Sequence, residues 1–258
     1  LAYEAATADL NDVNMIDPFH LETYGQTAVN YNRDVEIFPV VAAIFEKIAG
    51  ESPYHSPTDM GVNMAGNCIV DDEICREASC QEIIRRYFQA RCDVRMGRAE
   101  ENGVHKIELL MNQAKISQDS RPIVATAETL AEQTGNPAAA IQLEDGEIIT
   151  GKTSSLLGAS AAALLNALKH LAGLPDELHL LPPLIIEPIQ RLKTHGLGNH
   201  NPRLHTDEVL IALSISAATN PAADLAIQQL ANLKGCEVHS SVILAQVDDG
   251  VFHKLGMN

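Results

Sequence analysis

Three histidines spaced five residues apart make one segment the chemically densest part of the chain. His195, His200 and His205 alternate there with glycine, asparagine and one arginine. Catalytic zinc sites commonly use three protein ligands, so one hypothesis is a metal ion bound by these three imidazoles. The alternative is a polar loop that lines a pocket and whose histidines bond to backbone groups. We favour this alternative because no cysteine accompanies the histidines.

The end of the same segment suggests an anion site next to a helix. Asn199, Asn201 and Arg203 precede a helix expected to begin near residue 206, and the free N–H groups of a helix N-terminus attract anions. Asp207 and Glu208 in the first turn oppose this hypothesis, because their carboxylates already compensate the helix dipole. The polar-loop hypothesis and the anion-site hypothesis both place polar side chains along a pocket.

A second candidate for phosphate binding is the segment 146–153, which fits G-x-x-x-x-G-K-(S/T) letter for letter. A phosphate loop needs backbone N–H groups that curl around the anion. Here the Asp-Gly pair that ends at Gly146 is a hairpin-turn signal, and the residues after it have the pattern of a strand. We therefore predict a hairpin. A weaker expectation is that an anion binds at Lys152, Thr153 and Ser154, just before a helix.

A turn-rich segment at residues 54–64 supplies further candidates. Its composition favours a turn capped by Thr58 and Asp59. The functional alternative makes a histidine or an aspartate of this segment a general base. The catalytic candidates are His55, Asp59 and His200, and the further ligand-binding candidates are Arg33 and Asn63.

The net charge of −16 limits the partners of the chain. Such a charge repels nucleic-acid phosphates and anionic lipid headgroups, and no apolar run approaches the ~20 residues of a membrane span. We therefore expect a small-molecule ligand, no nucleic acid and no membrane. Two expected helices, at 160–172 and 209–218, are apolar almost all round and must be buried against something, so we also expect a homo-oligomer.

The cysteines indicate a reducing compartment. Their number, five, is odd, and no pair has the C-x-x-C spacing of a zinc or redox motif. Free buried thiols are the simplest interpretation. We therefore expect a cytoplasmic protein.

The pattern of apolar residues divides the chain into two parts. Residues 1–117 predict a mainly helical subdomain, with a clear apolar stripe along 36–49. Residues 118–258 alternate between helices and strands, including the hairpin and a strand at 238–247. The fold class is therefore α/β (α+β), with helices around a small mixed sheet in the second part. The chain begins with leucine and stops just after a helix-ending glycine, so we expect it to be a piece of a longer protein.

Six long stretches carry a resemblance to a known family. Among them are NHNPRLHTDEVLIALSI and HSSVILAQVDDGVFHKLGMN, and together they lie at 1–25, 28–40, 56–64, 151–169, 199–215 and 239–258. They resemble the bacterial uncharacterised protein family 0371, also called domain of unknown function 1846, and the match runs along essentially the whole chain. The resemblance implies that the chain is the C-terminal half of a longer protein. It implies an N-terminal half with a Rossmann-like or P-loop-like domain, which has its own glycine-rich, lysine-containing loop. It also implies a helical subdomain followed by a three-layer α/β subdomain whose topology is similar to cytidine deaminase-like folds, and it implies no activity.

Zinc deaminase chemistry does not fit the residues. Those enzymes need H-x-E or C-x-E followed by P-C-x-x-C, and no P-C-x-x-C is present. The nearest arrangement, Cys236 to His239, runs in the wrong order. We therefore expect no deaminase activity.

The polar loops lead to one functional hypothesis and two alternatives. The hypothesis is an enzyme that acts on a phosphorylated or nucleotide-like small molecule, with a Mg-nucleotide bound mainly by the N-terminal half that the resemblance implies. The first alternative is a structural or oligomerisation module. The second is a metal-dependent hydrolase that uses the histidine cluster.

Overall fold

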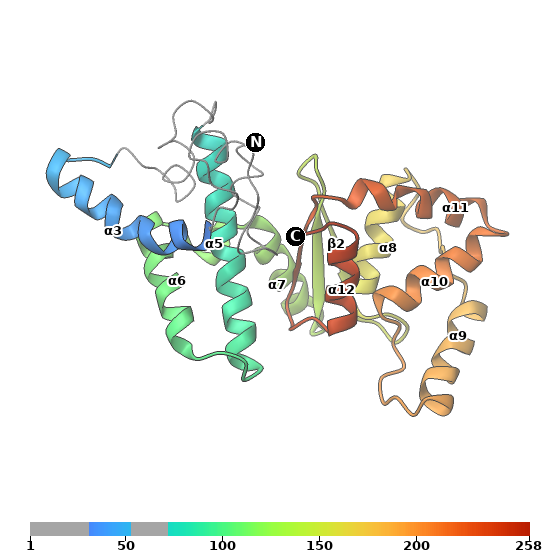
Figure 1. Ribbon diagram of the computed structural model, residues 1–258. Helices are drawn as coiled ribbons and strands as arrows, with labels where there is room; N and C mark the ends of the chain where they lie inside the picture. The colour runs from blue at the N-terminus through green and yellow to red at the C-terminus, as the bar shows by residue number, and fades with distance from the viewer. Residues whose placement is uncertain (1–30, 53–71) are drawn as a thin grey trace, which may run out of the picture. The chain divides into compact units, whose positions relative to one another are not determined.

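The computed structural model describes residues 31–52 and 72–258 (Figure 1). The chain divides into two units, Leu1–Arg121 and Pro122–Asn258. Each unit buries its own cluster of apolar side chains. None of the helices in the described ranges has the length and apolar content needed to cross a lipid bilayer.

In its described residues, 31–52 and 72–121, the first unit is mainly helical. Its long helices are α3 (Tyr31–Ala49), α5 (Asp72–Arg95) and α6 (Glu101–Ala114), followed by a 3₁₀ turn, η3 (Gln118–Ser120). Apolar residues three or four positions apart on α5 and α6 face one another and form the core. The buried members are Ile83, Ile84, Tyr87, Val104, Leu110 and Met111.

One carboxylate is buried beside this core. Glu82 accepts hydrogen bonds from Arg85 at 2.9 Å and from Arg86 at 2.7 Å. Burial raises the pKa of Glu82 in spite of these two guanidinium groups. The ion pair is therefore poor compensation for the loss of water around the carboxylate.

The second unit is built on a three-stranded sheet. The strands are β1 (Ala138–Gln142), β2 (Ile148–Lys152) and β3 (Glu237–Ser240), in the order β2-β1-β3. Both pairs are antiparallel, so the prediction of a mixed sheet is wrong for the described part of the chain. The strand predicted at 238–247 ends at Ser240, which pairs with Ala139 of β1. One further backbone bond follows, from the N–H of Ser241 to the carbonyl oxygen of Ala138, the first residue of β1.

Helices cover both faces of this sheet, which makes the unit α/β. Helix α7 (Pro122–Thr134) packs on all three strands, and α8 (Ala159–Leu171) packs on β1 and β2 from the other side (Figure 1). The central strand β1 is buried from Ala138 to Ile141, as expected for a strand covered on both faces. Small residues let α8 approach closely: a Cβ atom at Gly151 would lie 2.1 Å from the backbone nitrogen of Ala163.

The predicted hairpin between β1 and β2 forms. The N–H of Leu143 donates a hydrogen bond to the carbonyl oxygen of Glu147 at 2.8 Å. The N–H of Gly146 donates one to the carbonyl oxygen of Leu143 at 2.9 Å. The loop thus has three residues rather than two, with Gly146 in the left-handed region at φ 87°. The G-x-x-x-x-G-K-T segment is a hairpin arm, not a curled phosphate loop.

The remaining elements pack beyond α8 and next to β3. They are α9 (Pro183–Arg191), the π-helical turn η4 (Leu192–Gly196), α10 (Thr206–Ala217), α11 (Pro221–Ile227), the 3₁₀ turn η5 (Gln228–Leu233) and α12 (Gln246–Lys254). Helix α10 contacts α8, α9, α11 and α12. It therefore holds this side of the unit together.

Candidate functional site

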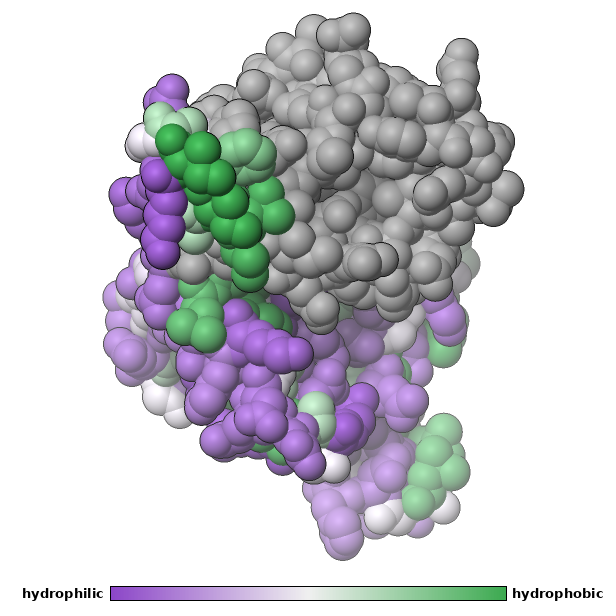
Figure 2. All heavy atoms as spheres, turned by 60° about the vertical axis from the view of Figure 1, so that its left-hand side comes forward, coloured by the Kyte–Doolittle hydropathy of each residue, from purple (hydrophilic) through white to green (hydrophobic). Residues whose placement is uncertain are grey.

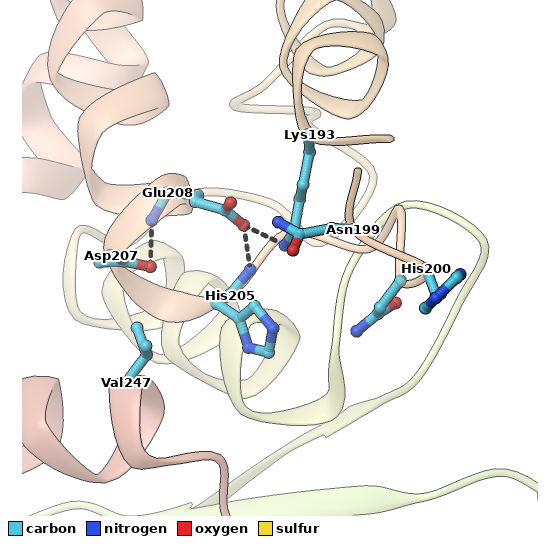
Figure 3. A pocket seen from close by; sticks show the side chains of 8 residues that line it. Lys193, Asn199, His200, His205, Asp207, Glu208 and Val247 are labelled. Atoms are coloured by element: carbon cyan, nitrogen blue, oxygen red, sulfur yellow. Dashed lines mark hydrogen bonds and ion pairs between the residues drawn. The ribbon is translucent and has the colours of Figure 1, made fainter. Parts of the chain in front are cut away.

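A pocket of about 450 Å³ opens where the loop after α9 meets the first turns of α10 and α12 (Figure 3). Two segments that are far apart in the sequence thus contribute to it. All but one of its lining side chains are polar or charged. They are Lys193, Asn199, His200, Asn201, His205, Asp207, Glu208 and Val247.

One lining residue of the pocket is a histidine that is hydrogen-bonded to a buried aspartate. Nδ1 of His205 lies 3.1 Å from Oδ2 of Asp248. The other oxygen, Oδ1, accepts hydrogen bonds from the backbone N–H and the hydroxyl of Thr206, both at 2.9 Å. Three bonds thus fix the carboxylate, and Nδ1 of the neutral imidazole carries the proton that it donates to Asp248. The lone pair of the imidazole is then on Nε2.

A buried lysine and a glutamate form the adjacent wall. Nζ of Lys193 lies 2.6 Å from Oε2 of Glu208 and 2.6 Å from the carbonyl oxygen of Arg203. The same Oε2 accepts the backbone N–H of His205 at 2.8 Å. Lys193 belongs to the π-helical turn, and such turns occur frequently at functional sites. The lysine therefore fixes this turn to the N-terminus of α10.

The second carboxylate of this helix turn has no cationic partner among the residues that the structure describes. Oδ1 of Asp207 accepts only the backbone N–H of Glu208, at 2.7 Å, and Asp207 makes no ion pair within residues 31–52 and 72–258. Because Glu208 already neutralises Lys193, the carboxylate of Asp207 gives the pocket a local negative charge. Groups that donate hydrogen bonds are favoured beside it.

The loop before α8 lies beside the loop before α10, although about fifty residues separate them in the sequence. Nε of Arg203 bonds to the carbonyl oxygen of Ser154 at 2.7 Å. Leu204 exchanges backbone bonds with Leu156 at 2.9 Å and Gly158 at 3.1 Å. The two loops therefore lie side by side.

Comparisons with known proteins identify the family of the chain. The C-terminal model of the domain of unknown function DUF1846 matches residues 119–258, and its N-terminal model matches residues 1–115. The chain belongs to the DUF1846 family. It therefore contains parts of both domains and is not limited to the C-terminal one.

Curated relatives within the DUF1846 family include UPF0371 proteins of Corynebacterium urealyticum, Corynebacterium efficiens and Streptococcus pyogenes. Each is 58% identical to this chain, which is covered to 100%. The chain spans about half the length of these relatives, 52% in each case. The family description assigns no activity, so the function must be argued from the site.

Among the predicted ligand-binding residues of this DUF1846 chain whose side chains the structure describes, two line the pocket, Asn199 and Asn201, and four do not, namely Lys152, Thr153, Ser154 and Arg203. The side chains of Lys152 and Thr153 are absent from the pocket lining, and the N–H of Thr153 bonds to the carbonyl oxygen of Pro137 at 2.8 Å. Both residues extend the β2 arm. Arg203 and Ser154 bond to each other through the guanidinium Nε and the backbone carbonyl oxygen.

The predicted metal site is not formed. Within the described ranges no three His, Cys, Asp or Glu side chains gather as metal ligands would. His195 lies in the π-helical turn with Nδ1 2.9 Å from the hydroxyl of Thr194, while His205 is bonded to Asp248. The equal spacing of the histidines does not bring them together, because a π-turn and a helix N-terminus aim them differently.

The remaining predicted residues cannot be placed. His55, Asp59 and Asn63 lie outside the described residues, as does the rest of the 54–64 segment. Arg33 is in α3, in the part whose side chains are not described. Of the three catalytic candidates only His200 is located, and it lines the pocket.

Three polar residues in or beside the pocket, Lys193, Glu208 and Asp248, were not among the predicted site residues. Glu208 had a usable signal, since a glutamate at the third helical position completes a capping box. The sequence around Asp248 indicated only the start of a helix. It did not indicate a contact with His205, which lies 43 residues away in the sequence. Lys193 had no signal either, because a π-turn is not predictable from residue spacing.

Proposed function

We propose that the pocket binds a polar small molecule and that His205 accepts a proton from it, as part of an enzyme acting on a phosphorylated or nucleotide-like compound. The observation that carries the proposal is the 3.1 Å approach of Nδ1 of His205 to Asp248. A carboxylate at Nδ1 fixes the tautomer of the imidazole and stabilises the imidazolium that forms when Nε2 takes a proton. Nε2 is the proton acceptor in this proposal.

The charges of the pocket indicate which part of the ligand it holds. The carboxylate of Asp207 has no cationic partner among the described residues, so the pocket favours hydroxyl or amino groups. A phosphate group would be held at the edge by Arg203, whose guanidinium uses only Nε in the described part of the chain. A Mg-nucleotide would be held mainly by the part of the longer family proteins that this chain does not include.

Thermal-shift measurements with defined probes test the proposal. We expect ribose 5-phosphate, glucose 6-phosphate or AMP at millimolar concentration to raise the Tm of the chain. A ligand at about 100 times its Kd adds about 2.7 kcal/mol to the unfolding free energy. His200→Ala and Asn199→Ala should reduce this shift without changing the Tm of the free protein, since neither side chain holds the fold. His195→Ala is the matched control from the same loop, outside the pocket lining.

The result that contradicts the proposal is equally specific. If none of the probes raises the Tm, or if His195→Ala lowers the shift as much as His200→Ala, the pocket is not the binding site. The Corynebacterium urealyticum relative, which contains the additional half, serves as the full-length comparison. A shift seen only there would assign the binding energy to the additional half.

Two further expectations stay proposals. One is a cytoplasmic location, which the free thiols of Cys92 and Cys236 support. The other is a topology like that of cytidine deaminases, for which the layers of helices on both faces of the sheet are the support. The second candidate function is oligomerisation. It is favoured by the side of α10 that carries the exposed apolar residues Ile211 and Ile215.

A further inference from the structure

Helix α10 is apolar on the side that faces away from its own unit. Its inner residues, among them Val209, Leu213 and Ser216, are buried. On the opposite side, Ile211 is 60% exposed and Ile215 is 61% exposed, one helical turn apart. A helix that is apolar all round is normally buried on all sides, so the outer face of α10 needs a covering partner.

The outer face of α10 is also free of charge. No charged residue occurs between Glu208 and Asp224, although the chain has a net charge of −16. Two copies of so acidic a chain repel one another over most surfaces. They can approach most easily where charges are absent, and depletion of charge is typical of the core of a protein interface.

A comparable apolar stripe on α3 is not free of charged residues. Figure 2 shows apolar side chains gathered on the first unit, where Ile44 and Ile48 of α3 are exposed. Glu46 and Lys47, both exposed, lie directly beside them. The charge-free stretch therefore distinguishes α10 from α3.

We propose that the outer face of α10 binds the same face of a second copy of this chain, with the two helices antiparallel across a two-fold axis. The outer stripe consists of Ile211, Ser214, Ile215 and Ala218, which alternate large and small side chains. In an antiparallel pair centred between residues 214 and 215, Ile211 lies against the partner's Ala218 and Ile215 against the partner's Ser214. Each large side chain thus meets a small one, as a self-complementary contact requires.

The proposed contact is confined to α10. Helix α11 packs directly against α10, but its exposed Leu225 is next to the exposed carboxylate of Asp224, so α11 adds no charge-free surface. The pocket is not part of this contact, and the proposal does not depend on ligand binding or proton transfer there.

Sedimentation velocity of the 258-residue chain from 5 to 100 µM tests the proposal. We expect the parent chain to sediment as a dimer, and Ile211→Glu or Ile215→Glu to sediment as monomers with unchanged circular dichroism. Ile48→Glu, on the charged helix α3, is the matched control and should remain dimeric. A parent chain that is monomeric at 100 µM overturns the proposal, since the partner is then something other than a second copy. A dimer that survives Ile215→Glu overturns it as well.

Cysteine cross-linking tests the antiparallel register separately. Ser214→Cys lies next to the two-fold axis, so oxidation should link two copies, above the level of the parent chain. Ala218→Cys lies about one turn from the axis and should not link to itself. Equal cross-linking of both variants contradicts the proposed pairing of the helices.

Discussion

Replacing Asp248 with alanine removes the carboxylate that joins the first turn of α10 to the first turn of α12. The carboxylate accepts three hydrogen bonds, two of them from the backbone and hydroxyl of Thr206. Thr206 is fully buried, so water cannot replace the lost acceptor. The third donor, His205, is partly exposed and can bond to water instead.

The size of the effect follows from the two stranded donors. Leaving one buried polar group without a partner costs about 1–3 kcal/mol, so the two stranded donors of Asp248→Ala should lower the unfolding free energy of the second unit by roughly 2–6 kcal/mol. For a domain of this size that corresponds to a Tm lower by about 7–20 °C. Asp248→Asn keeps an acceptor for Thr206 and loses only the bond to His205, so we expect a loss of about 1 kcal/mol.

The matched control is Asp249→Ala. Asp249 is the next residue and belongs to the same first turn of α12, but its side chain is half exposed and meets only His253, at 3.6 Å. Its replacement should cost no more than about 0.5 kcal/mol. Urea unfolding with hydrogen exchange measured on peptides of α10 and α12 reports the second unit alone. Equal losses for the two alanine variants would refute the role given to Asp248.

Three further predictions concern other parts of the molecule. Gly151→Ala should destabilise the second unit by about 3 kcal/mol in urea unfolding, because the new Cβ would overlap the backbone of Ala163; Gly250→Ala, which meets nothing within 4 Å in α12, should not destabilise it. The thiol of Cys236 should resist iodoacetamide in the native protein, because it is buried and burial raises its pKa; rapid native labelling at this position, measured by peptide mass spectrometry, would contradict the burial. Since burial raises the pKa of Glu82 above its unfolded value, its contribution to stability is present below the unfolded pKa and is lost as the pH rises through the folded pKa. Unfolding free energies measured across that pH range should therefore fall less for Glu82→Gln than for the parent chain, and parallel curves would contradict this sign.

Local patterns predicted the elements of this fold well. The stripe along α3 and the Asp-Gly turn depend on neighbours in the sequence, so they were visible without a structure. The end of β3 was not, because it depends on pairing with β1, which lies nearly a hundred residues earlier.

In the candidate site, too, only features that depend on neighbours in the sequence were predictable. Asn199, His200 and Asn201 were predictable as loop residues with polar side chains, and they line the pocket. Their partners Lys193 and Asp248 were not, since a π-turn and the packing of α12 bring them there. Equal spacing of histidines suggested a metal site only because spacing says nothing about the direction in which each ring points.

The central claim is that His205, oriented by Asp248, is the proton acceptor of a ligand-binding pocket. A long-range ¹H–¹⁵N spectrum of the histidine rings, titrated with ribose 5-phosphate, tests it most directly. We predict that the neutral ring of His205 carries its proton on Nδ1, and that its Nε2 signal shifts on addition of the probe. In Asp248→Asn the preference for this tautomer should be lost. A neutral ring with its proton on Nε2 in the parent chain, or an Nε2 signal that does not respond to the probe, would contradict the claim.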